Sequence, residues 1–272
     1  MVKWQFSFEV DGIHLSKNKV SVSERVDLER IDDYKSRAHI IIDISQPEGS
    51  IVIPSSKPAK EILNDFLSVY LVVTGMSGRI VQELGGSQVP GTGGRGASVS
   101  PVRTITVRPT IPESDSMRMI EQAKRDFEIF ADAENSLKLA VRHSYQAAQT
   151  ERAEDKVILY FICLDALYIE APGELGYRLS QRVALMLGES EDERKGIFEK
   201  VKGLYRKRGS IVHGVSTSLS PEDVDSLRDY VHRSISMFFE LKVLGKSKSD
   251  ILNLLDSAWQ SGKLIDELLQ SE

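Results

Sequence analysis

The proline content of this chain changes abruptly at Pro109 and Pro112. Before this point, short apolar segments are separated by prolines and glycines, whereas the remainder of the chain contains only Pro172 and Pro221. Proline removes a backbone donor and interrupts helices, so a long segment with few prolines favours helical structure. We therefore predict an α+β chain, with a β-rich domain over residues 1–110 and an all-α helical domain over residues 111–272.

The first region carries the period-two pattern of half-buried strands, as in the alternation from Trp4 to Val10. One apolar segment, residues 58–74, predicts a single helix. The segment from Gly85 to Gly96 holds six glycines and Pro90, which predicts a loop. The predicted strands are residues 4–10, 39–45, 50–54 and 102–107.

The second region carries the 3.6-residue period of amphipathic helices. Ser220 and Pro221 are typical of a helix start, and Gly188 is suited to a left-handed helix end. The predicted helices are residues 114–149, 152–169, 177–187, 191–208 and 220–244, followed by two short helices at 249–257 and 259–269.

Composition limits the chemistry that the chain can perform. Its single cysteine, Cys163, lies in an apolar run and is predicted to be a buried hydrophobe, so an intrachain disulfide and a cysteine-based zinc site are excluded. The N-terminus has no signal-peptide pattern and no segment approaches the length of a membrane span. We expect a cytoplasmic protein with no membrane partner.

Two motifs that suggest a cofactor fail in their context. The segment Gly91–Gly96 has the spacing of a dinucleotide-binding loop, but a predicted strand follows it where a helix would be required. No two of the five histidines lie three or four residues apart, so no helical metal-binding pair exists. We expect no cofactor and no metal, and ordinary packing or surface roles for His39, His143 and His232.

A basic run is the most informative segment of the chain. Five of the nine residues from Lys200 to Arg208 are basic, although 35 basic and 40 acidic residues give a net charge of −5. This run predicts a local anion-binding face. Arg208 and His213 follow each other with four residues between them. A guanidinium holds a phosphate and an imidazole transfers protons near neutral pH, so together they can cleave RNA through its 2′-hydroxyl without a metal.

Three ordered motifs extend this observation. Residues 155–168 end in Leu-Asp-Ala-Leu-Tyr, residues 174–188 contain Tyr-Arg-Leu-Ser-Gln-Arg-Val-Ala, and residues 204–214 read Leu-Tyr-Arg-Lys-Arg-Gly-Ser-Ile-Val-His-Gly. Over about residues 115–245 the chain resembles the Apea-like branch of the HEPN superfamily. The resemblance implies a helical bundle that dimerises and in which the Arg-His motifs of two protomers form one metal-independent RNase site.

Carried over by position, the resemblance makes Arg208 the phosphate-binding arginine and His213 the catalytic histidine. Gly209 departs from the family's small polar residue, so a supporting hydrogen bond is either missing or supplied by Ser210. Asp165 replaces the usual glutamate and shortens its reach. Further supporting or RNA-binding candidates are Arg178, Arg182, Lys202, Tyr205, Arg206, Lys207 and Ser210.

Two assignments stay open at this point. Arg206 lies seven residues before His213, and a continuous helix would bring both to one face, but a helix that ends at Gly209 would not. Arg178 and Arg182 lie four residues apart on one helix face, either as phosphate contacts or paired with Asp165 or Glu174. We favour the structural pairing.

These observations favour a HEPN endoribonuclease of the kind found in toxin and antiviral defence systems. Its expected partners are RNA, a second copy of the chain, and a regulatory protein or trigger at the N-terminal domain, whose 13 basic and 12 acidic residues give it no electrostatic reason to bind RNA. The alternatives are a nuclease-inactive HEPN module that dimerises and binds RNA, nucleotide or protein, and a structural accessory subunit.

Overall fold

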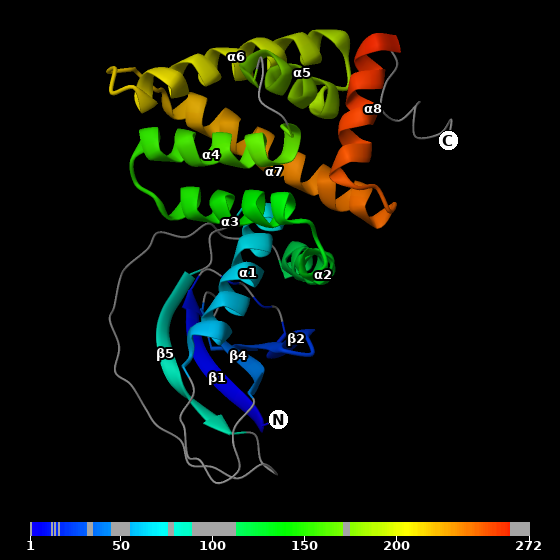
Figure 1. The fold of residues 1–272 in the computed structure, drawn as a ribbon. Coiled ribbons are helices and arrows are strands. Elements are labelled where there is room, and N and C mark those ends of the chain that lie inside the picture. Colours follow the sequence, from blue (N-terminus) through cyan, green and yellow to red (C-terminus); the bar gives the residue numbers. More distant parts are fainter. Residues whose placement is uncertain are drawn as a thin grey trace. The chain divides into compact units, whose positions relative to one another are not determined.

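The structure is a computed structural model that describes residues 2–11, 13, 15, 17–31, 35–44, 55–75, 79–88, 113–170 and 175–261 (Figure 1). The chain separates into two compact units, Met1–Glu128 and Ile129–Glu272. The boundary lies inside helix α2 (Glu113–Ala131), beyond the residue near which the sequence predicts it. The chain is α+β, with an antiparallel sheet in the first unit and helices throughout the second.

The first unit contains a five-stranded sheet in the order β2-β3-β4-β1-β5, in which all neighbours pair antiparallel. Trp4, Phe6, Phe8 and Val10 of β1 are all buried, which confirms that the alternation marks a half-buried strand. Helix α1 (Lys57–Thr74) packs on β4 and β5. The strands are β1 (Val2–Asp11), β2 (Lys19–Ser23), β3 (Val26–Arg30), β4 (Lys35–Ile44) and β5 (Arg79–Gln88).

The sheet corrects one sequence prediction and contains three strands that the sequence does not predict, β2, β3 and β5. Gly85 and Gly86 were predicted to open a loop, but they belong to β5 and pair with Ser7 and Phe6 of β1. The register shifts twice along this pair, and glycine tolerates such bulges because it has no side chain to accommodate. β2 and β3 alternate between buried and less buried residues, but each has only two buried positions, and β5 contains the Gly85-Gly86 pair, so none of the three is predicted from the sequence. The predicted strands at 50–54 and 102–107 lie outside the described residues.

The helical elements match most of the sequence predictions, with one break. The helix predicted over 114–149 is two helices, α2 and α3 (Asn135–Gln149), separated by a turn at Asp132. Acidic and amide side chains compete for backbone groups and favour helix ends, which explains the break in the Asp-Ala-Glu-Asn segment. Lys138 Nζ donates to the Ala131 carbonyl at 2.8 Å and so satisfies one acceptor at the end of α2.

The remaining helices form the rest of the second unit, where α5 lies alongside α6 (Figure 1). Their bounds are α4 (Ala153–Tyr168), α5 (Leu175–Leu187), α6 (Glu191–Val212), α7 (Pro221–Val243) and α8 (Lys248–Ser261). Cys163 of α4 is fully buried, as predicted. Helix α8 runs past Ser257 as one element, where the sequence predicted a stop. None of the helices in the described part of the chain is long and apolar enough to cross a bilayer.

Gly188, which the sequence predicts to be a left-handed helix end, plays a different role. Gly188 does not adopt a positive φ, which corrects the predicted left-handed cap. It is required by a close approach instead, because an added Cβ would lie 2.8 Å from the backbone nitrogen of Arg194. The left-handed cap occurs after α6, at Gly214 with φ +72°, and it lets the amides of Gly214 and Val215 bond the carbonyls of Ile211 and Ser210.

Candidate functional site

Helix α6 divides its basic residues among different faces because successive residues are rotated by about 100°. Lys200 and Lys207 are seven residues apart and lie on one face. Arg208 points toward α4. Lys202, Arg206 and His213 share a third face, because they are four and seven residues apart. The basic run is therefore not a single anion-binding surface.

The face with Lys200 and Lys207 is neutralised by Asp223 at the start of α7. Its two carboxylate oxygens accept hydrogen bonds from Lys200 Nζ at 2.9 Å and from Lys207 Nζ at 2.6 Å. Asp223 also forms a capping box with Ser220, which confirms the predicted helix start. The hydrogen bond from Lys207 is the largest of the effects that hold the pKa of Asp223 well below its usual range. Lys207 thus stabilises the α6–α7 corner.

The third face is open. Arg206 is exposed and makes no ion pair with another described residue, and His213 is exposed at the C-terminal cap of α6. Helix α6 continues through Gly209, so Arg206 and His213 are two turns apart along one helix. The structure therefore preserves the alternative in which Arg206 shares a face with His213.

Arg208 is half-buried and has one aromatic neighbour, Tyr205, and one acidic neighbour, Asp165. Its guanidinium carbon is 5.6 Å from the centre of the Tyr205 ring, and its Nη2 is 3.9 Å from Oδ2 of Asp165 on α4. Tyr205 is itself fixed, because its ring meets Phe161 edge to face at 5.4 Å and presses against Gly176. Tyr205 and Phe161 thus position Arg208 where α6 faces Asp165 of α4.

The pair of Arg208 and Asp165 is poorly satisfied. Arg208 Nε and Asp165 Oδ1 are both buried and have no hydrogen-bond partner. Burial raises the pKa of Asp165, and the nearby Arg208 opposes this shift only partly. Buried polar atoms are normally hydrogen-bonded, so an under-satisfied pair points to a role beyond stability. Because Nε itself is buried, a phosphate oxygen would accept hydrogen bonds from the terminal guanidinium nitrogens of Arg208.

Arg182 is different, since it is a buried structural residue. Its Nε and Nη2 donate to the two carboxylate oxygens of Asp256 on α8 at 3.0 and 2.8 Å, and its Nη1 donates to the carbonyl of Tyr168. The structural role favoured by the sequence agrees with this geometry, but the partner is Asp256 and not Asp165. Arg178 is exposed on α5.

The resemblance implies a polar side chain that supports Arg208 by a hydrogen bond, and neither Gly209 nor Ser210 supplies one. Ser210 Oγ donates to the Arg206 carbonyl of its own helix at 3.4 Å, so it is not directed at Arg208. A Cβ added at Gly209 would meet nothing within 4 Å, so the helix surface is open there. Lys202 lies over the Phe198 ring at 5.0 Å and 3.9 Å from Glu199.

The sequence analysis missed Asp223 and Asp256, which neutralise basic candidates from other helices. Asp223 had one available signal, its position three residues after Ser220. The partnership of Arg182 with Asp256 had none, because the two residues are 74 positions apart.

The other three described histidines have structural contacts, and His14 lies outside the described residues. His39 Nδ1 lies 2.9 Å from Ser7 Oγ and 3.0 Å from Gln5 Nε2 on the sheet, and His232 Nε2 lies 3.1 Å from Ser144 Oγ in the helical unit. His143 is within 3.2 Å of Gln146. The residues that the structure describes include no cluster of three or more His, Cys, Asp or Glu that could hold a metal ion.

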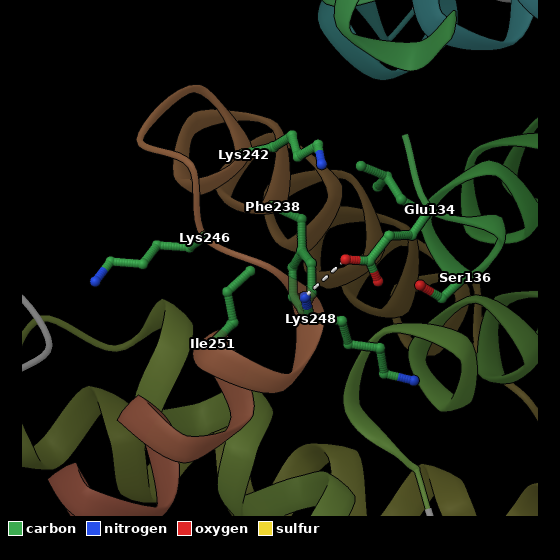
Figure 2. Close-up of a pocket in the computed structure, with 8 residues that line it drawn as sticks. Glu134, Ser136, Phe238, Lys242, Lys246, Lys248 and Ile251 are labelled. Atoms are coloured by element: carbon green, nitrogen blue, oxygen red, sulfur yellow. Dashed lines mark hydrogen bonds between the residues drawn. The ribbon is translucent and has the colours of Figure 1, made fainter. Parts of the chain in front are cut away.

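A pocket lies at the opposite end of α7 from Asp223 (Figure 2). It is lined by three lysines, but two of its polar residues already stabilise the fold. Glu134 accepts the backbone N–H of Lys248 at 3.2 Å, and Lys248 Nζ donates to the Ile169 carbonyl at 2.7 Å. These bonds join the starts of α3 and α8 to the end of α4, so the pocket is a structural junction. The lining residues are Glu134, Ser136, Leu137, Phe238, Lys242, Lys246, Lys248 and Ile251.

Helix α6 therefore carries an incompletely bonded guanidinium, Arg208, beside Asp165, and an exposed imidazole, His213, on a different face at its end. The chain matches no protein-family model, no curated protein and no solved structure.

Proposed function

We propose that the helical unit is a HEPN-type endoribonuclease that cleaves RNA without a metal ion. The observation that carries the proposal is the half-buried Arg208, whose Nε has no partner and whose nearest carboxylate is 3.9 Å away. A cation held by aromatic packing but not consumed by an ion pair is suited to an anionic ligand. The exposed His213 at the end of the same helix supplies an imidazole, which can accept and donate a proton.

The proposed reaction uses the 2′-hydroxyl of RNA as nucleophile. Arg208 binds a non-bridging oxygen of the phosphate, and His213 accepts the proton of the 2′-hydroxyl as its oxygen bonds to phosphorus. The bond from phosphorus to the 5′-oxygen then breaks, and the leaving oxygen takes a proton from an imidazolium. The products are a 2′,3′-cyclic phosphate and a 5′-hydroxyl.

One protomer contains a single His213, whereas the reaction requires one proton acceptor and one proton donor. A two-fold dimer that joins two copies of the open face would supply both. Val212 and Val215 flank His213 and are 54% and 58% exposed, which supports a protein contact at this place. We propose a regulatory or protein-binding role for the N-terminal unit, because its charge is balanced.

The test is cleavage of total RNA by the purified full-length chain in EDTA, beside a His213→Ala variant. We expect cyclic-phosphate ends in EDTA and resistance of a substrate with a 2′-deoxy sugar at the scissile position. Activity that requires Mg²⁺, or that His213→Ala retains at the wild-type rate, would refute the proposal.

A nuclease-inactive RNA-binding module is the second candidate. The observation that favours it is at Gly209 and Ser210, where no side chain is directed to support Arg208. This candidate predicts that the chain binds RNA and leaves it intact in the same assay. A structural accessory subunit would neither bind nor cleave RNA.

A further inference from the structure

The first turn of α5 presents an aromatic side chain to solvent, one residue after the glycine that contacts Tyr205. Tyr177 is 45% exposed, although its ring meets Phe198 of α6 edge to face at 5.3 Å and 76°. An exposed ring that is held by one contact loses little conformational freedom when a second ring stacks on it. Tyr177 is therefore suited to stack against a flat ligand.

Tyr177 is linked to Arg208 through Gly176, which precedes it in the chain, and through Tyr205. A Cβ added at Gly176 would lie 2.7 Å from Cδ1 of Tyr205, so the backbone of α5 is in close contact with the Tyr205 ring. The same Tyr205 ring carries the guanidinium of Arg208 at 5.6 Å. Gly176, the residue before Tyr177, and Arg208 thus both contact the Tyr205 side chain.

Lys202 is placed beside this ring by a shared neighbour, because its Nζ lies 5.0 Å from the centre of the Phe198 ring that Tyr177 contacts. Arg178 follows Tyr177 on α5, and Arg206 lies one turn after Lys202 on α6. Among the described residues these cations have one acidic partner, Glu199, which is 3.9 Å from Lys202 and 64% exposed. An exposed pair at this distance is weak and yields readily to another anion.

We propose that Tyr177 and Lys202 form a base-and-phosphate subsite for single-stranded RNA. Tyr177 stacks on an unpaired base, and Lys202 with Arg206 binds the adjoining phosphates. Aromatic rings interleaved with cations recognise single strands, because bases inside a duplex are already stacked and unavailable. The identity of the ligand rests on the proposed function, since the same features without RNA chemistry would specify only an anionic aromatic compound.

The experiment measures binding of a fluorescent single-stranded RNA of about 20 nucleotides to the full-length chain. Every variant carries His213→Ala, which prevents cleavage from distorting the titration. We expect Tyr177→Ala to weaken binding about 5- to 150-fold, the range for loss of one base stack, and Tyr177→Phe to retain it. Trp259→Ala is the matched control, since Trp259 is an aromatic residue of α8 that is 55% exposed, and it should bind as the parent does.

Three outcomes would overturn the subsite. The first is equal affinity of Tyr177→Ala and the parent. The second is an equal loss for a duplex of the same length, because this would show a general charge or folding effect. The third is a change of molar mass of the RNA-free chain in light scattering on Tyr177→Ala, because this would assign the ring to a contact between copies of the chain.

The failure of the subsite and the failure of the proposed function are distinguishable. If Tyr177→Ala binds normally while cleavage by the wild-type chain depends on His213, only the subsite is wrong. If no cleavage occurs and Tyr177→Ala loses affinity for the single strand, the nuclease proposal is wrong and the subsite stands.

Discussion

Two arginines of the helical unit occupy opposite situations. Arg182 is buried, and its guanidinium makes hydrogen bonds to both oxygens of Asp256 and to the Tyr168 carbonyl. Arg208 is half-buried, makes one contact of 3.9 Å to Asp165 and leaves its Nε without a partner. A fully bonded arginine stabilises the fold and has no donor left for a ligand, whereas an arginine with spare donors can bind one. The difference separates a structural cation from a candidate functional one.

The largest expected effect sharpens this comparison directly. Arg208→Ala should lower the rate of RNA cleavage about 10²- to 10⁴-fold, the range for loss of one positioned catalytic group, and should leave the melting temperature nearly unchanged. Arg182→Met should do the reverse and lower the melting temperature with little effect on the rate per folded molecule. Cleavage rates and thermal unfolding of both variants provide the measurement. Equal loss of activity in two well-folded variants would break the distinction.

A third polar group, His232, shows how burial changes the protonation of a side chain in the helical unit. Burial lowers its pKa from 6.5 to about 4, and Arg228 adds to the shift. Above pH 6.5 the imidazole is neutral in both the folded and the unfolded chain, so its full contribution to the free energy of folding is present there. Between pH 6.5 and 4 only the unfolded chain takes up the proton, which costs about 3 kcal/mol of folding free energy.

Urea unfolding of wild type and His232→Gln at pH 7 and pH 4.5 measures this effect. Glutamine retains a hydrogen-bonding group for Ser144 but does not titrate, so the variant should lose less stability on acidification. Parallel losses in the two proteins would show that the carboxylates, and not His232, govern acid unfolding.

Asp256→Ala tests the structural pair from its exposed side. It leaves the Arg182 guanidinium buried with only the Tyr168 carbonyl, and removal of one partner from a buried pair is costly. Because the Asp256 side chain is 46% exposed, we expect a loss of about 2 kcal/mol, less than for a fully buried carboxylate. Chemical unfolding measures it, and a loss no greater than that of the surface variant Asp225→Ala would contradict the assignment.

The smallest effect is expected at the other pair. Asp165→Asn should change the free energy of unfolding by less than about 1 kcal/mol, because burial already disfavours the ionised carboxyl and its contact with Arg208 is poor. Since the pKa of Asp165 is raised in the folded chain, its charge is a cost at neutral pH that protonation relieves as the pH falls. A loss as large as that of Asp256→Ala would show that Asp165 and Arg208 form a structural pair.

The sequence by itself determined the α+β class, the burial of β1 and Cys163, and the start of α7. These features depend on local periodicity and on capping residues such as Ser220, which act within a few positions of the chain. It also located Arg208 and His213, because both lie on one element. Local signals did not reveal the break at Asp132. They also did not reveal the strand at Gly85, because the partner strand decides whether glycine enters a sheet.

The fate of each charged side chain was decided only by the tertiary structure. Lys207 and Arg208 are adjacent in one basic run, yet α7 brings Asp223 to the first and α4 brings Asp165 to the second. Arg182 meets Asp256 across 74 positions. Charge interactions depend on distance and burial in the folded chain, so composition shows that cations are present, and the packing of helices determines which of them are left to bind a ligand.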